Sequence, residues 1–170
     1  MERAIADQLE TLHPDAFGWA LHCCGGDHAR AEDVLQNAYL KLAQERARHD
    51  GRSSFKTWWF GVIRLTAHEE FRRVRYRESL VGKLLACFIE EHHPAPSRKV
   101  ESDERNAELR RCLKQLPARQ AEVLHLVFYQ DLTIQEAAGV MRVGIGSARQ
   151  HYERGKARLR TLLQPNSAHE

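Results

Sequence analysis

A proline-containing segment divides this chain into two parts of helical character. Residues 90–97 read Glu-Glu-His-His-Pro-Ala-Pro-Ser, and two alternate prolines oppose regular helix and favour extended backbone. On both sides apolar residues recur with the spacing of helices. Glycine and proline are scarce, at 10 and 5 in 170 residues. The sequence therefore predicts an all-α protein with two small helical domains, residues 1–78 and 106–170, joined by a flexible linker at 79–105.

The clearest helix of the first half lies near residues 31–42. Its apolar stripe consists of Ala31, Val34, Leu35, Ala38, Tyr39 and Leu42, at i, i+3, i+4, i+7, i+8 and i+11. The opposite face is polar and holds Asp33, Gln36, Asn37 and Lys41, with Leu40 among them. Leu40 is either an isolated exposed leucine, which is common in proteins, or the apolar centre of a protein-contact face.

The charge of the chain is distributed in blocks. The net charge is +3 overall, but residues 1–45 hold 8 acidic and 3 basic groups. Residues 46–78 hold 9 basic and 4 acidic groups, and residues 142–160 hold 6 basic groups and 1 acidic group. Two separate basic blocks suggest two contacts with a polyanion, although a charge run is commonly just a solvated face.

The first basic block combines a loop with a second helix. Gly51 allows a turn in the loop and a serine at its end can cap the helix that follows. Two adjacent tryptophans, Trp58 and Trp59, lie beside the basic side of that helix. They are either core residues or a stacking platform for unpaired bases next to cations that follow the backbone.

The second basic block follows a helix-turn-helix pattern. Residues 133–136, Thr-Ile-Gln-Glu, form a capping box, and Ala137 and Ala138 supply the small side chains that close helix packing needs. Residues 142–144 form a short turn into a basic helix that starts near Ile145. Two helices with a tight turn between them, the second one basic, are typical of DNA binding.

Enzymatic, metal and membrane functions find little support. His22, Cys23, Cys24 and His28 lie close in sequence, as do Cys87, His92 and His93, but neither group has the spacing of a structural zinc site. No HExxH, GxSxG or phosphate-binding glycine loop is present, which leaves a zinc hydrolase as the weakest alternative. There is no signal-peptide pattern and no run of 18 apolar residues. We expect a cytoplasmic protein without cofactor, metal or membrane insertion that is not an enzyme.

The motifs of the first half resemble a known family. Residues 31–40 (AEDVLQNAYL) are similar to the pattern A-E-D-L-V-Q-E-T-F-L, and residues 54–60 (SFKTWWF) are similar to F-R-A-W-L. An arginine-rich end follows at Arg72 and Arg73. These are features of region 2 of the extracytoplasmic-function (ECF) sigma factors of bacterial RNA polymerase.

The second half resembles region 4 of the same family. Residues 116–123 (LPARQAEV) are similar to L-P-x-R-x-R-E-V, residues 131–138 (DLTIQEAA) to G-L-S-Y-E-E-I-A, and residues 143–149 (VGIGSAR) to I-S-V-G-T-V-K. Four positions depart from the family pattern. In region 2, Leu65 stands where asparagine is common. In region 4, Arg142 stands where the turn normally has glycine, and His151 and Tyr152 replace a common Arg-Leu.

The resemblance implies an alternative sigma factor that binds core RNA polymerase and directs promoter-specific transcription initiation at −10 and −35 elements. Its implied partners are the β′ clamp helices and β flap of the polymerase, promoter DNA and an anti-sigma factor. The implied polymerase-binding residues are Asp33, Gln36, Asn37, Leu40 and Lys41. The implied −10 residues are Arg48, Arg52, Ser53, Lys56, Trp59, Arg64, His68, Arg72, Arg73 and Arg75. The implied −35 residues are Thr133, Ser147, Arg149, Gln150, His151 and Arg154.

The main alternative is a LuxR-type helix-turn-helix transcriptional regulator that does not act as a sigma subunit. Residues 116–160 resemble such domains almost as well. That alternative leaves the helix at 31–45 and the helix with two tryptophans without a role.

Overall fold

The computed structural model describes residues 2–85 and 111–163, and the regular structure within these ranges is helical. The principal helices are α1 (Glu2–Cys23), α2 (His28–Ala43), α3 (Phe55–Leu85), α5 (Ala118–Phe128), α6 (Ile134–Met141) and α7 (Ile145–Leu163). The prediction of an all-α protein is confirmed. Among these helices, none combines the length and the apolar character needed to cross a lipid bilayer.

The turn between α1 and α2 is built by two glycines and a cap. Gly25 and Gly26 have φ angles of 67° and 92°, a backbone region that residues with a Cβ rarely adopt. The Asp27 carboxylate then accepts a hydrogen bond from the backbone N–H of Arg30 at 3.1 Å. This cap satisfies one of the donors that a helix start leaves open, so α2 begins where the sequence supplies its Asp.

Helix α3 also begins with a side-chain cap. The Ser54 hydroxyl accepts a hydrogen bond from the backbone N–H of Thr57 at 3.2 Å, which confirms the predicted serine cap. The helix continues to Leu85, into the stretch that the sequence assigns to the linker. The prolines that oppose helix come later, at Pro94 and Pro96. Residues 86–105 of the predicted linker lie outside the described residues.

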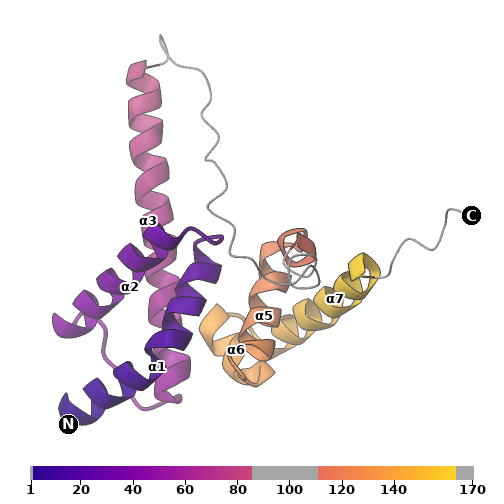
Figure 1. Cartoon of the computed structure of the whole chain (residues 1–170), viewed down its shortest axis with the longest axis horizontal. Coiled ribbons are helices and arrows are strands. Elements are labelled where there is room, and N and C mark those ends of the chain that lie inside the picture. The colour runs from indigo at the N-terminus through magenta and orange to yellow at the C-terminus, as the bar shows by residue number, and fades with distance from the viewer. Residues whose placement is uncertain (1, 86–110, 164–170) are drawn as a thin grey trace, which may run out of the picture.

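The first three helices pack around aromatic side chains. In Figure 1, α1 and α2 lie against the lower part of the long helix α3. Trp19, Trp59 and Phe60 are fully buried there. The Trp19 indole N–H donates to the backbone carbonyl of Phe60 at 3.0 Å, which ties α1 to α3.

The last three helices form the predicted helix-turn-helix with α5 behind it. Thr133 and Glu136 make the capping box at the start of α6, as predicted. Arg142 ends α6 in the left-handed conformation, with φ 55° and ψ 47°. Helix α7 crosses α5 closely at Gly155, where an added Cβ would come within 3.1–3.3 Å of Leu124 and Gln120.

The two halves share one buried core. The cluster contains Trp19 of α1 and Ile63 of α3 together with Val123 and Leu126 of α5 and Val140 of α6. Helix α6 packs along α3, and α5 also contacts α1 (Figure 1). The sequence predicted two small domains, which need not touch. The structure shows these halves closed on each other.

Candidate nucleic-acid and protein interfaces

Helix α2 presents a polar surface around one exposed leucine. Asp33, Gln36 and Leu40 are exposed, and 53% of the Leu40 surface is accessible. The apolar stripe on the other side, including Val34 and Leu35, is buried as predicted. An exposed leucine with polar neighbours on a rigid helix is suited to a protein contact, because it supplies apolar area that a partner can cover.

Asn37 and Lys41 belong to the edge of this face that turns toward α3. The Asn37 amide donates to Glu70 at 3.5 Å. The Lys41 ammonium donates to the Thr66 hydroxyl at 2.9 Å and to the Glu69 carboxylate at 2.7 Å. A partner that uses these two side chains must therefore compete with contacts inside the chain.

The loop before α3 is ordered by a histidine that the sequence analysis did not single out. A His49 ring nitrogen lies 2.8 Å from the backbone carbonyl of Ser53. Its ring meets Phe55 edge-on at 5.7 Å and lies 5.3 Å from the Trp58 ring. Arg48, Arg52 and Ser53 are exposed around it. The only signal in the sequence was a histidine flanked by arginines just before an aromatic helix start.

The outer part of α3 carries an exposed basic face. His68, Arg72, Arg73 and Arg75 are all exposed. Burial lowers the pKa of His68, and the neighbouring Arg64 guanidinium lowers it further. His68 therefore favours the neutral form, so the charge of this face comes from the arginines.

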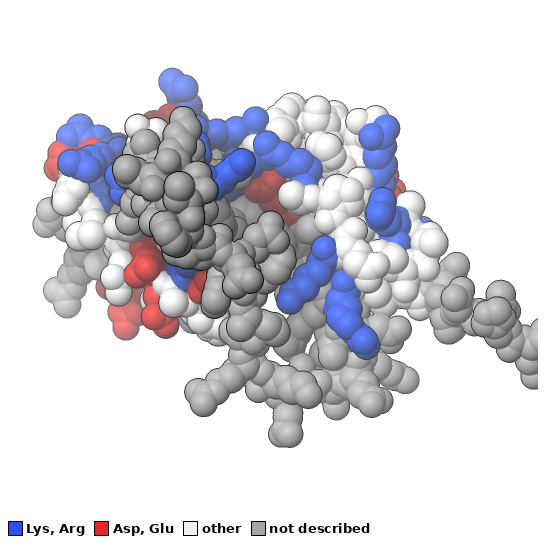
Figure 2. All heavy atoms as spheres, turned by 90° about the horizontal axis from the view of Figure 1, so that it is seen from above, with Lys and Arg blue, Asp and Glu red and all other residues white. Residues whose placement is uncertain are grey.

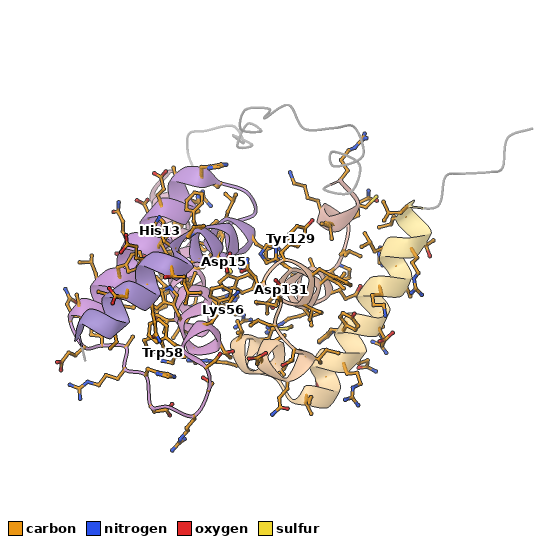
Figure 3. All side chains as sticks on the ribbon, turned by 60° about the horizontal axis from the view of Figure 1, so that its bottom comes forward. His13, Asp15, Lys56, Trp58, Tyr129 and Asp131 are labelled. Atoms are coloured by element: carbon orange, nitrogen blue, oxygen red, sulfur yellow. The ribbon has the colours of Figure 1, made fainter. Side chains whose placement is uncertain are left out.

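Lys56 lies at the start of α3 and is only partly accessible. Its ammonium forms an ion pair with the Asp15 carboxylate at 3.0 Å and lies 5.6 Å from the centre of the Phe60 ring. Figure 3 shows Asp15 and Lys56 on the side of the first half that faces Tyr129 and Asp131. Lys56 therefore lies near the contact between the halves.

Trp59 does not form the stacking platform that the sequence suggested. Its exposed fraction is 0%, and its ring packs against Tyr39 and Trp58 at 5.2 and 6.0 Å. The apolar face of α3 must cover the core of the first half, and Trp59 lies on that face. Trp58, the other tryptophan of the pair, is only partly buried and borders His49.

Arg64, one of the residues that the resemblance implies for the −10 element, does not lie on an open surface. It forms an ion pair with Glu122 of α5, and their side chains are only 9% and 12% exposed. Arg119 holds the other carboxylate oxygen of Glu122 at 3.2 Å. Sequence periodicity placed Arg64 opposite the core of its own half. It could not show that a helix 58 residues away covers that position.

The first turns of α7 form the exposed surface of the helix-turn-helix. Ser147, Arg149, Gln150 and Arg154 are exposed, and His151 is partly buried. Ala148 and Gly155 are buried against the neighbouring helices, so the helix has one fixed side and one open side. The open side is polar and basic near its N-terminal end, which suits hydrogen bonding to base edges and phosphates.

Thr133 serves the start of α6. Its backbone N–H and its hydroxyl both donate to the Glu136 carboxylate, at 2.9 and 2.8 Å, while the hydroxyl accepts from the Glu136 N–H at 3.2 Å. These bonds lower the pKa of Glu136. The Thr133 hydroxyl is exposed, but it already forms hydrogen bonds with Glu136, so its role in this structure is to cap α6.

The cysteines and histidines show no metal-binding arrangement in the residues covered by the structure. No group of three or more His, Cys, Asp or Glu side chains converges there. Burial raises the pKa of the Cys23 thiol well above its usual value and that of Cys24 to about 11. Thiols in this form are poor metal ligands and poor nucleophiles. The second predicted cluster, Cys87, His92 and His93, lies outside the described residues.

The charges seen on the surface follow the blocks in the sequence. In Figure 2, lysines and arginines appear over both halves, whereas acidic side chains appear mainly over the half formed by α1 to α3. A surface with separate basic areas on two halves can contact a long polyanion at two places.

Comparison with protein families gives two matches in the order that the motifs predicted. Residues 9–77 match the description "Sigma-70 region 2", and residues 106–159 match "Sigma-70, region 4". The helix-turn-helix is therefore accompanied by a second sigma region, which a LuxR-type regulator does not explain.

Individual relatives match most of the chain. The ECF RNA polymerase sigma factor SigX of Bacillus subtilis is 26% identical over 170 residues, covering 96% of this chain and 86% of SigX. The RNA polymerase sigma-H factor of Pseudomonas aeruginosa is 30% identical over 146 residues, covering 82% of this chain and 76% of the relative.

Solved structures show the same fold. The sigma factor RpoE of Bartonella quintana, solved with the anti-sigma factor NepR, has a TM-score of 0.69 at 24% identity and covers 96% of this chain and 99% of its own. CnrH, solved with the cytosolic domain of CnrY, has a TM-score of 0.65 at 20% identity, with coverages of 98% and 92%. With both sigma regions matched in order, the chain belongs to the ECF sigma factors of the sigma-70 family.

Proposed function

We propose that this chain is an alternative sigma subunit that binds core RNA polymerase and positions it at a −10 and a −35 promoter element. The observation that carries the proposal is that one chain holds two different exposed surfaces. The polar face of α2 surrounds Leu40, and the basic N-terminal part of α7 is open on a helix-turn-helix. The first surface suits a protein and the second suits DNA.

On the polymerase side, Asp33, Gln36 and Leu40 form the accessible part of the contact, and the β′ clamp helices are the proposed partner. Asn37 and Lys41 join it when their hydrogen bonds to Glu70 and Glu69 are exchanged. The apolar Leu40 side chain supplies buried area, and the polar residues around it supply orientation.

On the −10 side, the basic residues of the loop and of outer α3 hold the backbone of the opened strand. Arg52, Arg72 and Arg75 are exposed and neutralise phosphates, so binding weakens as salt rises. A base that leaves the duplex needs an aromatic or polar pocket to offset lost stacking. The His49 and Trp58 rings beside the loop are the accessible aromatic groups for that role.

On the −35 side, α7 enters the major groove. Ser147, Arg149 and Gln150 lie near its N-terminal end and read base edges, since recognition helices use that end for direct contacts. Arg154 lies further along and contacts phosphate or base. An anti-sigma factor is a further proposed partner, because the similar RpoE structure was solved with the anti-sigma factor NepR.

Run-off transcription tests the function as a whole. Core polymerase with the purified chain should start specifically at promoters mapped after overexpression, whereas the chain alone should bind the same DNA weakly. No gain of specific initiation over core polymerase alone would contradict the proposal. Binding as a dimer to a palindromic operator without polymerase would instead favour the LuxR-type alternative.

Two pairs of variants test the surfaces separately. Asp33→Ala should weaken core binding in a fluorescence titration, whereas Asp7→Ala, an equal charge change on exposed α1, should not. Arg149→Ala should weaken −35 protection by about 1–3 kcal/mol, the usual value of a good base contact. Arg160→Ala, in the last turn of α7, serves as its control. If a variant and its control have the same effect, the surface that this pair tests has been assigned wrongly.

A further inference from the structure

The loop before α3 keeps a defined shape through contacts of its own. The Asp50 carboxylate accepts a hydrogen bond from the backbone N–H of Arg52 at 3.2 Å and pairs with the Arg52 side chain at 3.3 Å. The Nε2 atom of His49 lies 2.8 Å from the backbone carbonyl oxygen of Ser53. Because these bonds connect one end of the loop to the other, they hold its exposed side chains in fixed places.

The hydrogen bond to Ser53 determines which nitrogen of His49 carries a hydrogen. A carbonyl oxygen can only accept, so Nε2 must be the donor. In a neutral imidazole the other nitrogen, Nδ1, then has no hydrogen and offers a lone pair. His49 is exposed, and no group among the residues that the structure describes bonds to Nδ1. The ring therefore presents a hydrogen-bond acceptor at the surface.

The other side chains of this loop that hold acceptor atoms already form hydrogen bonds within the chain. Both carboxylate oxygens of Asp50 are engaged by Arg52. The Ser53 hydroxyl donates to the Ser54 carbonyl at 3.4 Å, and the Ser54 hydroxyl accepts from the Thr57 N–H at 3.2 Å. A ligand that offers a donor to the side chains of residues 48–54 therefore finds His49 Nδ1 without an internal partner.

Trp58 lies next to this acceptor and provides a surface for stacking. Its ring centre is 5.3 Å from that of His49, and its side chain is only partly buried. Phe55 supports both rings, edge-on to His49 at 5.7 Å and tilted against Trp58 at 5.3 Å. In Figure 3, Trp58 lies on the side of the first half where the chain leads into α3. Stacking holds any base, whereas a hydrogen-bonding group beside it distinguishes one base from another.

We propose that His49 reads one unpaired base of the −10 strand through Nδ1 and selects adenine or cytosine over guanine and thymine. The inference rests on the proposed function and adds a class of base to its −10 contact. Adenine and cytosine carry an exocyclic amino donor where guanine and thymine carry a carbonyl oxygen. An acceptor nitrogen repels that oxygen, and the ring N–H groups of guanine and thymine each lie beside such an oxygen. The pair of rings therefore accepts one class of base and rejects the other.

A cycle that combines a base change with a residue change tests this assignment. Core polymerase with the chain is titrated with a single-stranded −10 probe from a promoter mapped after overexpression, at about pH 8, where histidine side chains are ordinarily neutral. Each adenine is replaced in turn by purine and each cytosine by 2-pyrimidinone, which removes the amino group and keeps the ring. At one position this change should weaken binding about 3- to 10-fold, the value of one hydrogen bond.

The same base changes are then measured with His49→Phe, which keeps an aromatic ring against Phe55 and Trp58. The loss at that position should disappear, because the acceptor is gone. His49→Gln keeps one donor for Ser53 and one acceptor, so it should retain the preference. His28→Phe, at an exposed position at the start of α2, is the control and should behave as the wild-type chain.

A purely structural role of His49 gives a different result. His49→Phe would then weaken binding by the same factor whether or not the probe carries the amino group. That outcome, or a preference for guanine or thymine at the position that depends on His49, would overturn the base reading. Specific initiation by the wild-type chain would still support the sigma function.

The isolated chain gives a measurement that does not depend on polymerase. It should bind oligo(dC) about 3- to 10-fold more tightly than oligo(dT), two strands with the same ring size, and His49→Phe should remove the difference. If the chain gives no specific initiation with core polymerase, the proposed function fails and this measurement decides the base reading. Equal binding of the two strands by the wild-type chain, or no binding of either, would then contradict it.

Discussion

At the scale of single residues, Arg142 is one of three described non-glycine residues with a left-handed backbone, together with Glu45 and Asp131. The turn of the helix-turn-helix needs a left-handed residue, and Arg142 adopts it with φ 55° and ψ 47°. Its backbone N–H still bonds to the Ala138 and Gly139 carbonyls, so the surrounding helix end imposes the conformation.

Arg142→Gly should therefore stabilise the chain. A left-handed backbone costs a residue with a Cβ roughly 1–2 kcal/mol, which glycine avoids. Glycine also gives the unfolded chain more conformational freedom, and this cancels part of the gain in stability. We expect a net gain of about 0.5–1 kcal/mol, visible as a rise in the thermal midpoint of about 1–4 °C. Arg142→Ala removes the same charge but keeps the Cβ, so it should show no such gain. Equal midpoints for the two variants would contradict this explanation.

The adjacent tryptophans provide a second test at the same scale. Trp59→Ala should destabilise the chain by about 3–5 kcal/mol, as expected for a large buried side chain, because its exposed fraction is 0%. Trp58→Ala should cost clearly less stability and should reduce opening of the −10 region instead. Chemical denaturation and permanganate footprinting measure the two effects. A loss of promoter opening by Trp59 variants that fold normally would restore the stacking hypothesis.

At the scale of elements, the position of the recognition helix depends on how closely α7 approaches α5. Gly155 makes this approach possible, since even a methyl group there would come within 3.1–3.3 Å of Leu124 and Gln120. Gly155→Val should cost about 1–3 kcal/mol of stability by overpacking. Gly146→Ala, in the same helix with open space around it, should instead be neutral or gain up to about 1 kcal/mol. Thermal denaturation of the two variants measures the difference, and equal loss from both would contradict the packing argument.

Most of these elements follow from the sequence because their signals are local. The caps at Ser54 and Thr133, the turn at 142–144 and the start of α7 at Ile145 were all predicted, and the structure confirms each. The burial of Trp59 and Arg64, in contrast, could not be predicted from the sequence. Helical periodicity tells which side chains share a face, but not which distant helix covers that face. Arg64 meets Glu122 only because the two halves close.

At the scale of the whole molecule, the stacked histidines make closing dependent on pH. Burial lowers the pKa of His125 to about 3, and the nearby His22 contributes to this. Burial also lowers the pKa of His22, although the Glu122 carboxylate opposes that shift. Arg64 of α3 pairs with that Glu122 carboxylate, and on the side of His125 lie Tyr129 and Gln130. Both rings are therefore neutral in the closed form.

The sign follows from these directions. In the open form each imidazole has an ordinary pKa of about 6.5, so protons favour opening. The neutral histidines stabilise the closed form fully when the pH lies above that pKa, and this stabilisation is lost as the pH falls below it. At about pH 5.5, His125 alone should reduce the closing equilibrium roughly tenfold. Fluorescence energy transfer between dyes on the two halves should fall accordingly, while far-UV circular dichroism stays constant.

Two histidine variants serve to assign this effect. His125→Gln should remove most of the pH dependence of the energy transfer. His28→Gln, at an exposed position at the start of α2, should leave it unchanged. Constant energy transfer in the wild-type chain from neutral pH to about pH 5.5 would contradict the role of the histidine pair.

The covalent connection between the halves has a consequence for dosage. Because both halves belong to one chain, the packing of α5 and α6 on α1 and α3 is a first-order process, and its equilibrium does not change with the concentration of the protein. Making more of this protein therefore raises the number of open molecules but not the open fraction. Only a ligand that binds the open form shifts that fraction, by a free energy of RT ln(1 + [L]/Kd).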